Sequence, residues 1–464
     1  MLKAWNVILV TITFLLTILG TFLTRSGVLW SIHAFANGPL GSYFLSYLIV
    51  AVLFSVVVIA WRFDRLRADR QFEAVVSKES AFLLNNVLFL GSAFAVLWGT
   101  VFPLVSEALT GHKMLVDSPF YNSVNLPLAV CILILMGVGP LVAWRRAAVK
   151  SIAGVVVYPL VVSVGVGLAM SGILRFSYQR VSVLGTLGLI AAVFAALTVF
   201  LEFYRSVTAR VALTREPAWR SLLALVRNNR RKYGGYLVHL AVALIAVGIA
   251  GSGAFNVSKQ QALAPGETAT VGGYQLTFRG MGVSDVPGGR NMYANLVVER
   301  GDHTLGLLRP SATFYQNGQS PSTNVALYSR PLRDLYVVIL GTVDGNKAVF
   351  DMHVNPLVEW IWYGGYLFIV GTLVSLWPEG RRTSSTWRTA DHPVDQVYQQ
   401  LAELEYDFRM GKLDPGEYER TRTELRVRLQ EAEDTSQQIR RQVLDEVEQA
   451  VQAARGRSPG GSGS

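Results

Sequence analysis

Long apolar stretches, separated by short polar segments, are the strongest pattern along the chain. A helix that crosses a bilayer needs about 20 mostly apolar residues, and eight stretches reach that length. They lie at about residues 4–24, 40–61, 81–103, 126–144, 151–172, 182–201, 234–252 and 356–377. The pattern therefore predicts an all-α polytopic membrane protein with about eight transmembrane helices. Seven of them fall in a membrane domain of residues 1–252, and the eighth falls in residues 355–378.

Residues 253–354 carry a different pattern, in which apolar and polar positions alternate over short runs. The runs GGYQLTF at 272–278, ANLVV at 294–298 and LYVVIL at 335–340 are of this kind, and turn-forming residues separate them. Strands at this spacing indicate a small β-barrel or β-sandwich. We therefore expect a β-rich extracytoplasmic domain inserted between the seventh and eighth helices.

The last segment, residues 379–464, is polar and predicts a cytoplasmic helical hairpin. One helix is expected to end near Met410, where Gly411 and the pair Asp414-Pro415 form a turn before a longer helix. The closing sequence GRSPGGSGS is typical of a flexible end.

The distribution of lysine and arginine predicts the orientation, because short cytoplasmic loops carry an excess of these residues. Basic residues cluster after the second, fourth and sixth stretches, at Arg62, Arg65, Arg67, Arg70, Lys78, Arg145, Arg146, Lys150, Arg205, Arg210, Arg215, Arg220, Arg227, Arg230, Arg231 and Lys232. The intervening loops hold only Arg25, Lys113, Arg175 and Arg180. We therefore expect both termini in the cytoplasm and residues 253–354 on the periplasmic side.

The composition agrees with a membrane protein and excludes several classes of site. Of the 464 residues, 51% are hydrophobic and 16% are charged, whereas about a quarter of residues are charged in soluble domains. The single cysteine, Cys131, excludes an intramolecular disulfide and every metal site built from several thiolates. The net charge of +10 follows the positive loops, so we expect no nucleic-acid partner.

Two histidines stand out on physical grounds. His239 lies inside the seventh apolar stretch, where an ionisable side chain is costly and therefore a functional candidate. Its imidazole either binds a ligand or relays protons, or it is neutral and hydrogen-bonded to a neighbouring helix.

His33 lies just past the first stretch, in a segment whose apolar residues recur at helical spacing. That segment is expected to lie flat on the outer membrane surface, with Arg25 about two turns before His33. A histidine and an arginine at such an interface suit an amphipathic cofactor with carboxylates, because arginine pairs with them bidentately. The simpler alternative is an interfacial histidine without a ligand.

Four segments resemble the CcmF family of cytochrome c maturation proteins. They are the run LLTILGTFLTRSGVLWSIHAFA at 15–36, the pair Asn85-Asn86, the run RKYGGYLVHLAVALIAVGIAGS at 231–252, and NPLVEWIW at 355–362. The resemblance extends from Leu2 to about Trp377. It implies haem b inside the membrane and a second, substrate haem at the outer face, each held between two histidines.

By motif match, the resemblance makes His239 one ligand of the intramembrane haem iron and His33 one ligand of the outer haem iron. Arg25 is then placed to contact a haem propionate. In the family, a tryptophan-rich motif (WWD) and the partner histidine of each pair lie upstream of the segment that matches Leu2. We expect these from a separate N-terminal CcmF-like chain or from residues missing here.

The resemblance implies a subunit of the cytochrome c haem ligation complex in the bacterial inner membrane. Its reaction is thioether formation between haem vinyl groups and the thiols of apocytochrome c, performed as part of a haem lyase with other subunits. The expected partners are apocytochrome c, a haem carrier chaperone, other maturation subunits and membrane lipid. No catalytic acid or base is assigned. Two alternatives stay open: a transporter subunit for haem or another amphipathic solute, and a non-catalytic scaffold that docks maturation partners.

Overall fold

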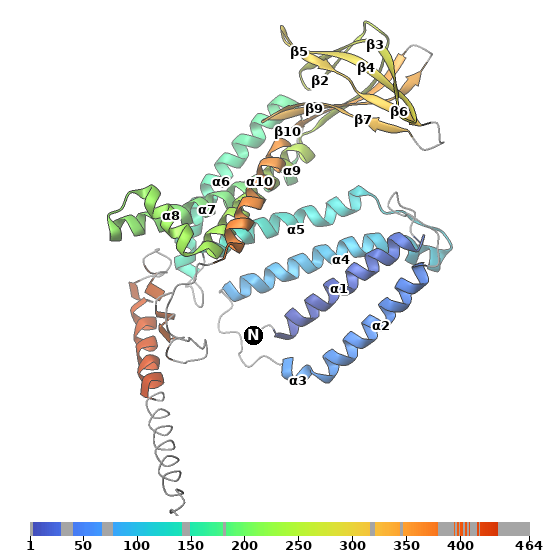
Figure 1. Cartoon of the computed structure of the whole chain (residues 1–464). Coiled ribbons are helices and arrows are strands. Elements are labelled where there is room, and N and C mark those ends of the chain that lie inside the picture. Colours follow the sequence, from blue (N-terminus) through green and yellow to red (C-terminus); the bar gives the residue numbers. More distant parts are fainter. Residues whose placement is uncertain are drawn as a thin grey trace, which may run out of the picture. The chain divides into compact units, whose positions relative to one another are not determined.

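The computed structural model describes residues 3–28, 40–66, 78–141, 149–179, 182–315, 321–343, 347–378 and 418–434, and scattered positions between 394 and 416. The chain divides into two compact units. The first comprises Met1–Val75 and Phe82–Leu128, and the second comprises Val76–Ala81 and Ala129–Ser464. Figure 1 labels the helices and strands of both units.

The regular elements in the described part of the first unit are all helices. Its elements are α1 (Lys3–Arg25), α2 (Leu40–Trp61), the short α3 (Phe63–Leu66), most of α4 (Lys78–Thr110) and the first half of α5 (Ser118–Val138). Helix α5 lies along α4, where Ser92 Oγ donates to Asn125 Oδ1 at 2.6 Å. Glycine at position 99 leaves room for the Tyr121 ring, which a Cβ atom would meet at 2.7 Å. Small and amide-bearing residues therefore bring these two apolar helices together.

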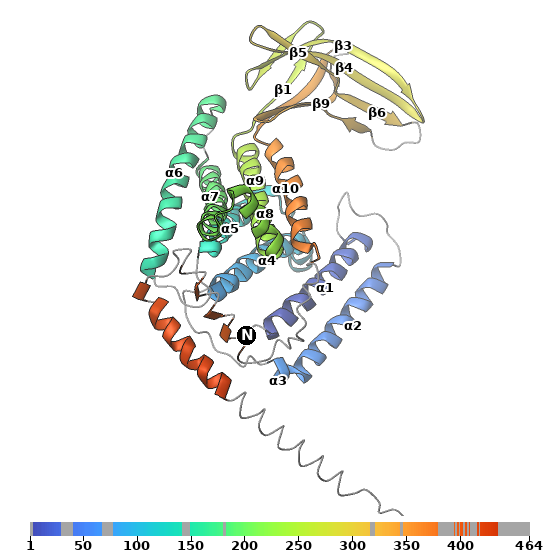
Figure 2. The ribbon, with the colours of Figure 1, turned by 60° about the vertical axis from the view of Figure 1, so that its left-hand side comes forward.

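The second unit contains the remaining helices. They are η1 (Gly139–Leu141), α6 (Val149–Tyr178), α7 (Val183–Thr214), α8 (Ala218–Asn228), α9 (Arg230–Ala254) and α10 (Glu359–Leu376). Ser182 is the N-cap residue of α7. Its side chain accepts a hydrogen bond from the backbone N–H of Gly185 at 3.0 Å, which satisfies an otherwise unpaired donor. Helices α7 and α10 both pack against α9 (Figure 2). Helix α9 is therefore the central element of this unit.

Seven of the described helices are long and apolar enough to cross a membrane. They are Ala4–Arg25, Leu40–Trp61, Ser80–Thr110, Ser118–Leu141, Val156–Tyr178, Val183–Ala212 and Arg230–Ala254. The chain is thus a multi-pass membrane protein, but the expected number of eight spans exceeds this set by one. The eighth predicted stretch forms α10, which has 18 residues and is shorter than any of the seven.

Helix α7 continues beyond its predicted end near residue 201. It runs to Thr214 and is followed by α8, where the sequence had indicated only a basic segment. The mixed sequence of α8 buries Ser221 and leaves Trp219 and Leu223 exposed. Apolar length alone could not reveal this extension, because amphipathic packing supports it instead of uniform hydrophobicity.

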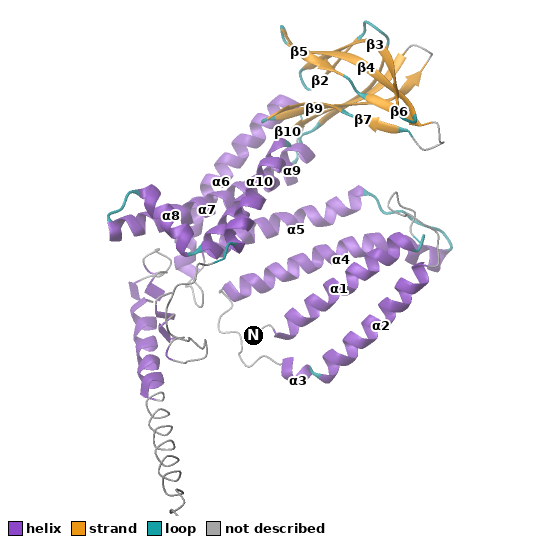
Figure 3. Ribbon diagram, viewed as in Figure 1, coloured by secondary structure: helices purple, strands orange, loops and turns teal. Residues whose placement is uncertain are grey.

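The predicted β-domain is present and consists of two antiparallel sheets (Figure 3). The strands are β1 (Val257–Leu263), β2 (Thr268–Val271), β3 (Tyr274–Val286), β4 (Gly289–Arg300), β5 (His303–Leu308), β6 (Ser311–Tyr315), β7 (Ser322–Asn324), β8 (Ala326–Arg330), β9 (Arg333–Val343) and β10 (Lys347–Pro356). One sheet has the order β1-β10-β9-β8 and the other β2-β3-β4-β6-β7, with β5 paired to β4. Alternate side chains of both sheets form the core, in which Phe278 and Phe350 meet edge to face at 5.2 Å.

The β-domain is joined firmly to the helices beside it. Its core is continuous with Leu174, Val247 and Phe255 at the ends of α6 and α9. Where β10 enters α10, Leu357 has φ 61 and its N–H donates to the carbonyl of Leu332 at 3.0 Å. A leucine in this left-handed conformation is strained, so the junction is a sharp and well-determined turn.

The described positions of the tail, within 394–408 and within 415–434, are helical. Contacts between these two ranges place Tyr398 beside Glu433, Tyr418 beside Glu405, and Phe408 on Tyr418 with ring centroids 4.1 Å apart. These pairings are those of an antiparallel helical hairpin.

Candidate functional site

Glycines on both helices hold α9 and α10 together along their length. A Cβ atom at Gly234 would lie 2.6 Å from the backbone N of Ser375, and one at Gly364 would lie 2.7 Å from the carbonyl O of Ala241. A Cβ atom at Gly248 would likewise lie too close to the backbone N of Ile361, at 2.9 Å. Close approach of two backbones through small residues is a strong form of helix association in membranes. The two helices therefore form one antiparallel pair.

Helix α7 packs on another side of α9, also antiparallel. A Cβ atom at Gly185 would lie 2.3 Å from Ala254 Cβ, and one at Gly188 would lie 3.4 Å from Ala250 Cβ. At the other end, the Tyr236 hydroxyl donates to Glu202 Oε2 at 3.2 Å. Helix α9 is therefore fixed on two sides, which determines the direction of each of its side chains.

His239 lies within this packed part of α9, three residues after Tyr236. The side chain is half-buried, and its Nδ1 atom is buried with no hydrogen-bond partner among the described residues. Buried polar atoms are almost always paired, so this nitrogen requires an explanation. An imidazole nitrogen in this state is suited to coordinate a metal ion. The imidazole of His239 is therefore available to a ligand that is not part of the described structure.

A metal site built from protein side chains alone does not accompany His239. The described residues contain no group of three or more His, Cys, Asp and Glu side chains that would hold an ion.

A buried acidic residue near His239 was not singled out by the sequence. Glu202 is fully buried on α7 and accepts a hydrogen bond from the Tyr236 hydroxyl. Glu202 directly follows residue 201, the predicted end of the sixth apolar stretch. It therefore did not stand out as an ionisable residue inside a membrane helix. A lone carboxylate inside a helix that the structure extends to Thr214 is the signal that would have found it.

The first unit carries the other predicted site residue that is described. Arg25 is the last residue of α1 and is exposed. His33 lies outside the described residues, so its position relative to Arg25 stays a prediction.

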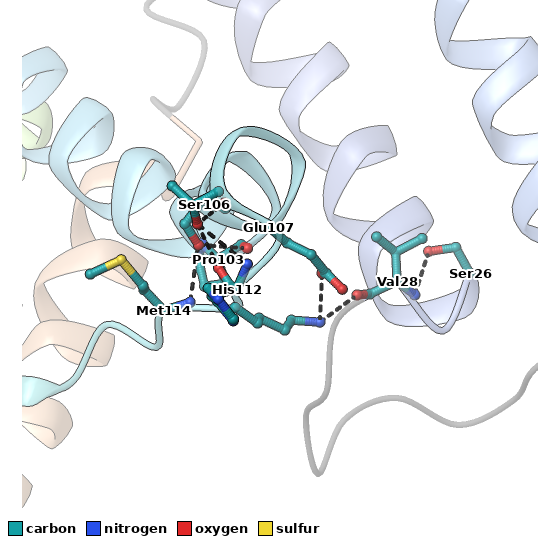
Figure 4. A network of polar contacts seen from close by, with 9 residues as sticks. Ser26, Val28, Pro103, Ser106, Glu107, His112 and Met114 are labelled. Atoms are coloured by element: carbon teal, nitrogen blue, oxygen red, sulfur yellow. Dashed lines mark hydrogen bonds and ion pairs between the residues drawn. The ribbon is translucent and has the colours of Figure 1, made fainter.

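Polar contacts fix the end of α1 to the loop that follows α4 (Figure 4). Lys113 Nζ donates to the carbonyl of Val28 at 3.2 Å and lies 3.7 Å from Glu107 Oε2. The loop itself is held because Ser106 Oγ accepts the N–H of Met114 at 3.0 Å. The chain immediately before the segment of His33 is therefore anchored by a cation from a different helix end.

The other described histidines belong to other elements. His112 is exposed in the loop after α4, and His303 is exposed at the start of β5. His353 lies on β10, where its Nε2 atom is 2.9 Å from Asp351 Oδ2 and its ring meets Tyr336 edge to face. This pair is on the outer face of the β-domain and is a surface ion pair when His353 is protonated.

Comparison with known proteins identifies the family. The model of the CcmF C-terminal beta-sandwich matches residues 254–356, which are the β-domain. The cytochrome c-type biogenesis protein CcmF of Pseudomonas aeruginosa is 32% identical over 372 residues, and CcmF of Escherichia coli is 30% identical over 395 residues. The chain belongs to the CcmF family.

A solved structure supports the same assignment at the level of the whole fold. The cytochrome c haem lyase CcmF superposes with a TM-score of 0.62 at 29% identity, over 81% of this chain and 55% of that one. The match to the P. aeruginosa protein covers 80% of this chain and 54% of the relative, and the match to the E. coli protein covers 84% and 58%. The chain thus spans somewhat more than half the length of these relatives.

Proposed function

We propose that the chain is a subunit of the cytochrome c haem ligation complex, in which His239 is an axial ligand of a haem b within the membrane. The observation that carries this proposal is the buried Nδ1 atom of His239, without a hydrogen-bond partner among the described residues, in a helix fixed on two sides. Family membership supports it, because the matching solved structure is named a haem lyase.

The bound haem would supply iron redox chemistry at this site. The part of this chain is to present the imidazole of His239 from α9 and to keep that helix in place through α7 and α10. A second ligand to the haem iron would come from a separate CcmF-like polypeptide that carries the tryptophan-rich motif, or from residues missing here. A rigid scaffold matters here, because an axial ligand must stay within a few tenths of an ångström of its position.

At the outer face, His33 is proposed as a ligand of the substrate haem, with Arg25 contacting a propionate. Lys113 anchors the chain just before that segment. Thioether formation joins each haem vinyl group to a cysteine thiol of apocytochrome c, so the reacting sulfur belongs to the substrate. The work of this chain is positioning, which by itself removes several kcal/mol of a barrier.

The orientation follows from the same proposal. We infer an inner-membrane location with both termini in the cytoplasm and the β-domain in the periplasm, where it meets apocytochrome c or a haem carrier chaperone. Basic residues at the starts of α8 and α9 support a cytoplasmic position for that end of the second unit.

The experiment compares His239→Ala with His353→Ala, a matched control on the β-domain, in the complex purified with its membrane partner. Haem content and the reduced-minus-oxidised spectrum are recorded for each. We expect His239→Ala to lose the haem b signal and His353→Ala to keep it. Imidazole added to His239→Gly should restore part of the signal, because it replaces the missing ligand.

A further variant separates the two haems. His33→Ala should retain haem b and fail to produce holocytochrome c. Normal haem content and a normal spectrum in His239→Ala would refute the intramembrane site and favour a scaffold that only docks partners.

A further inference from the structure

The most unusual polar group of the second unit is the carboxyl of Glu202. It lies in a helix that is long and apolar enough to cross a membrane, and its exposed fraction is 0%. Ionisable side chains in such places are costly and mark proton, ion or substrate pathways. The ligand role proposed for His239 does not explain why a carboxyl is buried here.

The surroundings of Glu202 form a compact polar and aromatic cluster between α7 and α9. Its Oε2 atom accepts the Tyr236 hydroxyl at 3.2 Å. The Tyr236 ring meets Phe203 and Tyr233 edge to face, each with ring centroids 5.9 Å apart. Lys232 Nζ lies 5.7 Å from the centre of the Tyr236 ring. The carboxyl is therefore buried and hydrogen-bonded to a tyrosine whose ring packs against two further aromatic rings.

The position of this cluster along α9 is informative. Tyr236 lies about 9 Å from the helix start at Arg230, and His239 lies about 4.5 Å further along, given a rise of 1.5 Å per residue. Residues three apart share a helix face, so Tyr236 and His239 point to the same side of α9. The Glu202–Tyr236 pair thus stands between the basic end of the helix and the proposed haem ligand.

We propose that Glu202 is the proton acceptor that compensates the electron taken up by haem iron at His239, with Tyr236 as its hydrogen-bond partner. The inference rests on the haem site proposed above. The bound haem would supply the redox centre, whose iron would pass from iron(III) to iron(II) by taking up one electron from a one-electron redox mediator. The Glu202 carboxylate gains one proton from the Arg230 side and becomes the neutral acid. The total charge of the buried site stays constant, which a medium of low dielectric constant strongly favours.

The other charged and titratable groups near Glu202 can be assigned element by element. Helix α7 itself brings Arg205, one turn further on, whose Nη1 atom is buried. Helix α9 brings Lys232, Tyr233, Tyr236 and His239.

The remaining elements packed against α7 contribute little. In α6 the tyrosine nearest this level, Tyr158, is 66% exposed. In α8 both Arg220 and Arg227 are exposed, and Arg220 lies over its own neighbour Trp219. The element η1 has no titratable side chain. Glu202 is therefore the carboxyl in this part of the structure that is both buried and next to the His239 helix.

The test is an optical redox titration of haem b in the assembled complex, from about pH 6 to about pH 8. One proton per electron shifts the reduction equilibrium about tenfold per pH unit, which is about 59 mV. We expect this slope in the wild-type protein and in Glu202→Asp, and a nearly flat line in Glu202→Gln. The matched control is Glu216→Gln, an exposed carboxyl paired with Arg210 at 3.4 Å, which should keep the slope.

Two results would overturn the inference: a flat line in the wild-type protein, and an unchanged slope in Glu202→Gln. If Glu202→Gln fails to retain haem, Tyr236→Phe decides. It keeps the carboxylate and removes its hydrogen-bond donor, so the pH dependence of the haem b reduction potential should differ from that of the wild-type protein; an unchanged dependence overturns the inference. Loss of haem in His239→Ala together with an unchanged slope in Glu202→Gln refutes this inference alone, whereas intact haem in His239→Ala refutes the proposed function.

Discussion

Replacing Gly364 by alanine should loosen the α9–α10 pair, because no Cβ atom fits at this position. The added carbon would lie 2.6 Å from Ile245 Cγ1, 2.7 Å from the carbonyl O of Ala241 and 2.9 Å from the backbone N of Ile245. Two of these three atoms belong to the backbone of α9, so a change of side-chain rotamer cannot relieve the clash. Helix α10 must move away instead.

The size of the effect follows from the geometry. Ordinary contact begins at 3.4 Å, so α10 must shift by about 0.7 Å, and overpacking of this kind costs about 1–3 kcal/mol. Alanine also favours a helix over glycine by about 0.5–1 kcal/mol. A Cβ atom at the adjacent Gly365 would have no other atom within 4 Å. Gly365→Ala therefore gains the same helix preference without the clash. The two variants should therefore differ by about 1–3 kcal/mol.

Hydrogen exchange measured by mass spectrometry on peptides of α9 and α10, in the full chain in mild detergent, gives this difference as a rate. We expect exchange in Gly364→Ala to be about 5- to 150-fold faster than in Gly365→Ala. Gly234→Ala and Gly235→Ala form a second matched pair, since a Cβ atom at position 234 meets Ser375 N at 2.6 Å and one at 235 meets nothing. Equal exchange within both pairs would refute the close packing of α9 and α10.

Two further predictions concern groups outside the membrane helices. Burial raises the pKa of Asp334, although Ser329 and the N–H of Arg330 donate to it. The folded β-domain then binds this proton more tightly than the unfolded chain, so its free energy of unfolding should rise as pH falls through the raised pKa. Asp334→Asn should flatten that dependence in hydrogen exchange of β8 and β9, and parallel pH profiles would contradict the assignment. In the tail, the hydrogen bond to Glu405 raises the pKa of Tyr418. Tyr418→Phe should therefore speed proteolysis at the predicted hairpin turn below about pH 10, and it should make no difference once the wild-type phenol has ionised. Equal proteolysis rates at every pH would show that the hydrogen bond contributes nothing.

The apolar pattern was sufficient to predict the helices that are uniformly hydrophobic and the β-domain between α9 and α10. Stretches such as 40–61 have one interpretation, because 22 consecutive mostly apolar residues have no other favourable place than a bilayer. The helical extension of α7 to Thr214 was missed, since its stability comes from packing against α8. Helix α10 was counted as a span although it is shorter than the other seven.

The candidate site was predictable only in part. His239 was found because a histidine within an apolar helix is conspicuous in the sequence. The pairing of Glu202 with Tyr236, on the same helix as His239, was not found, since these two residues lie far apart along the chain and meet only through the packing of α7 against α9. The φ of 61 at Leu357 is likewise set by the junction between strand and helix, and no local sequence signal indicates it.

The most direct test of the central claim is the reduced-minus-oxidised haem spectrum of this chain, purified alone and with its co-purifying membrane partner. The account predicts a haem b signal in the complex, no signal in the isolated chain, and loss of the signal from the complex in His239→Gly. Haem b on the isolated chain would contradict the division of the two axial ligands between polypeptides. An unchanged spectrum of the His239→Gly complex would contradict the claim that this chain holds haem iron through His239.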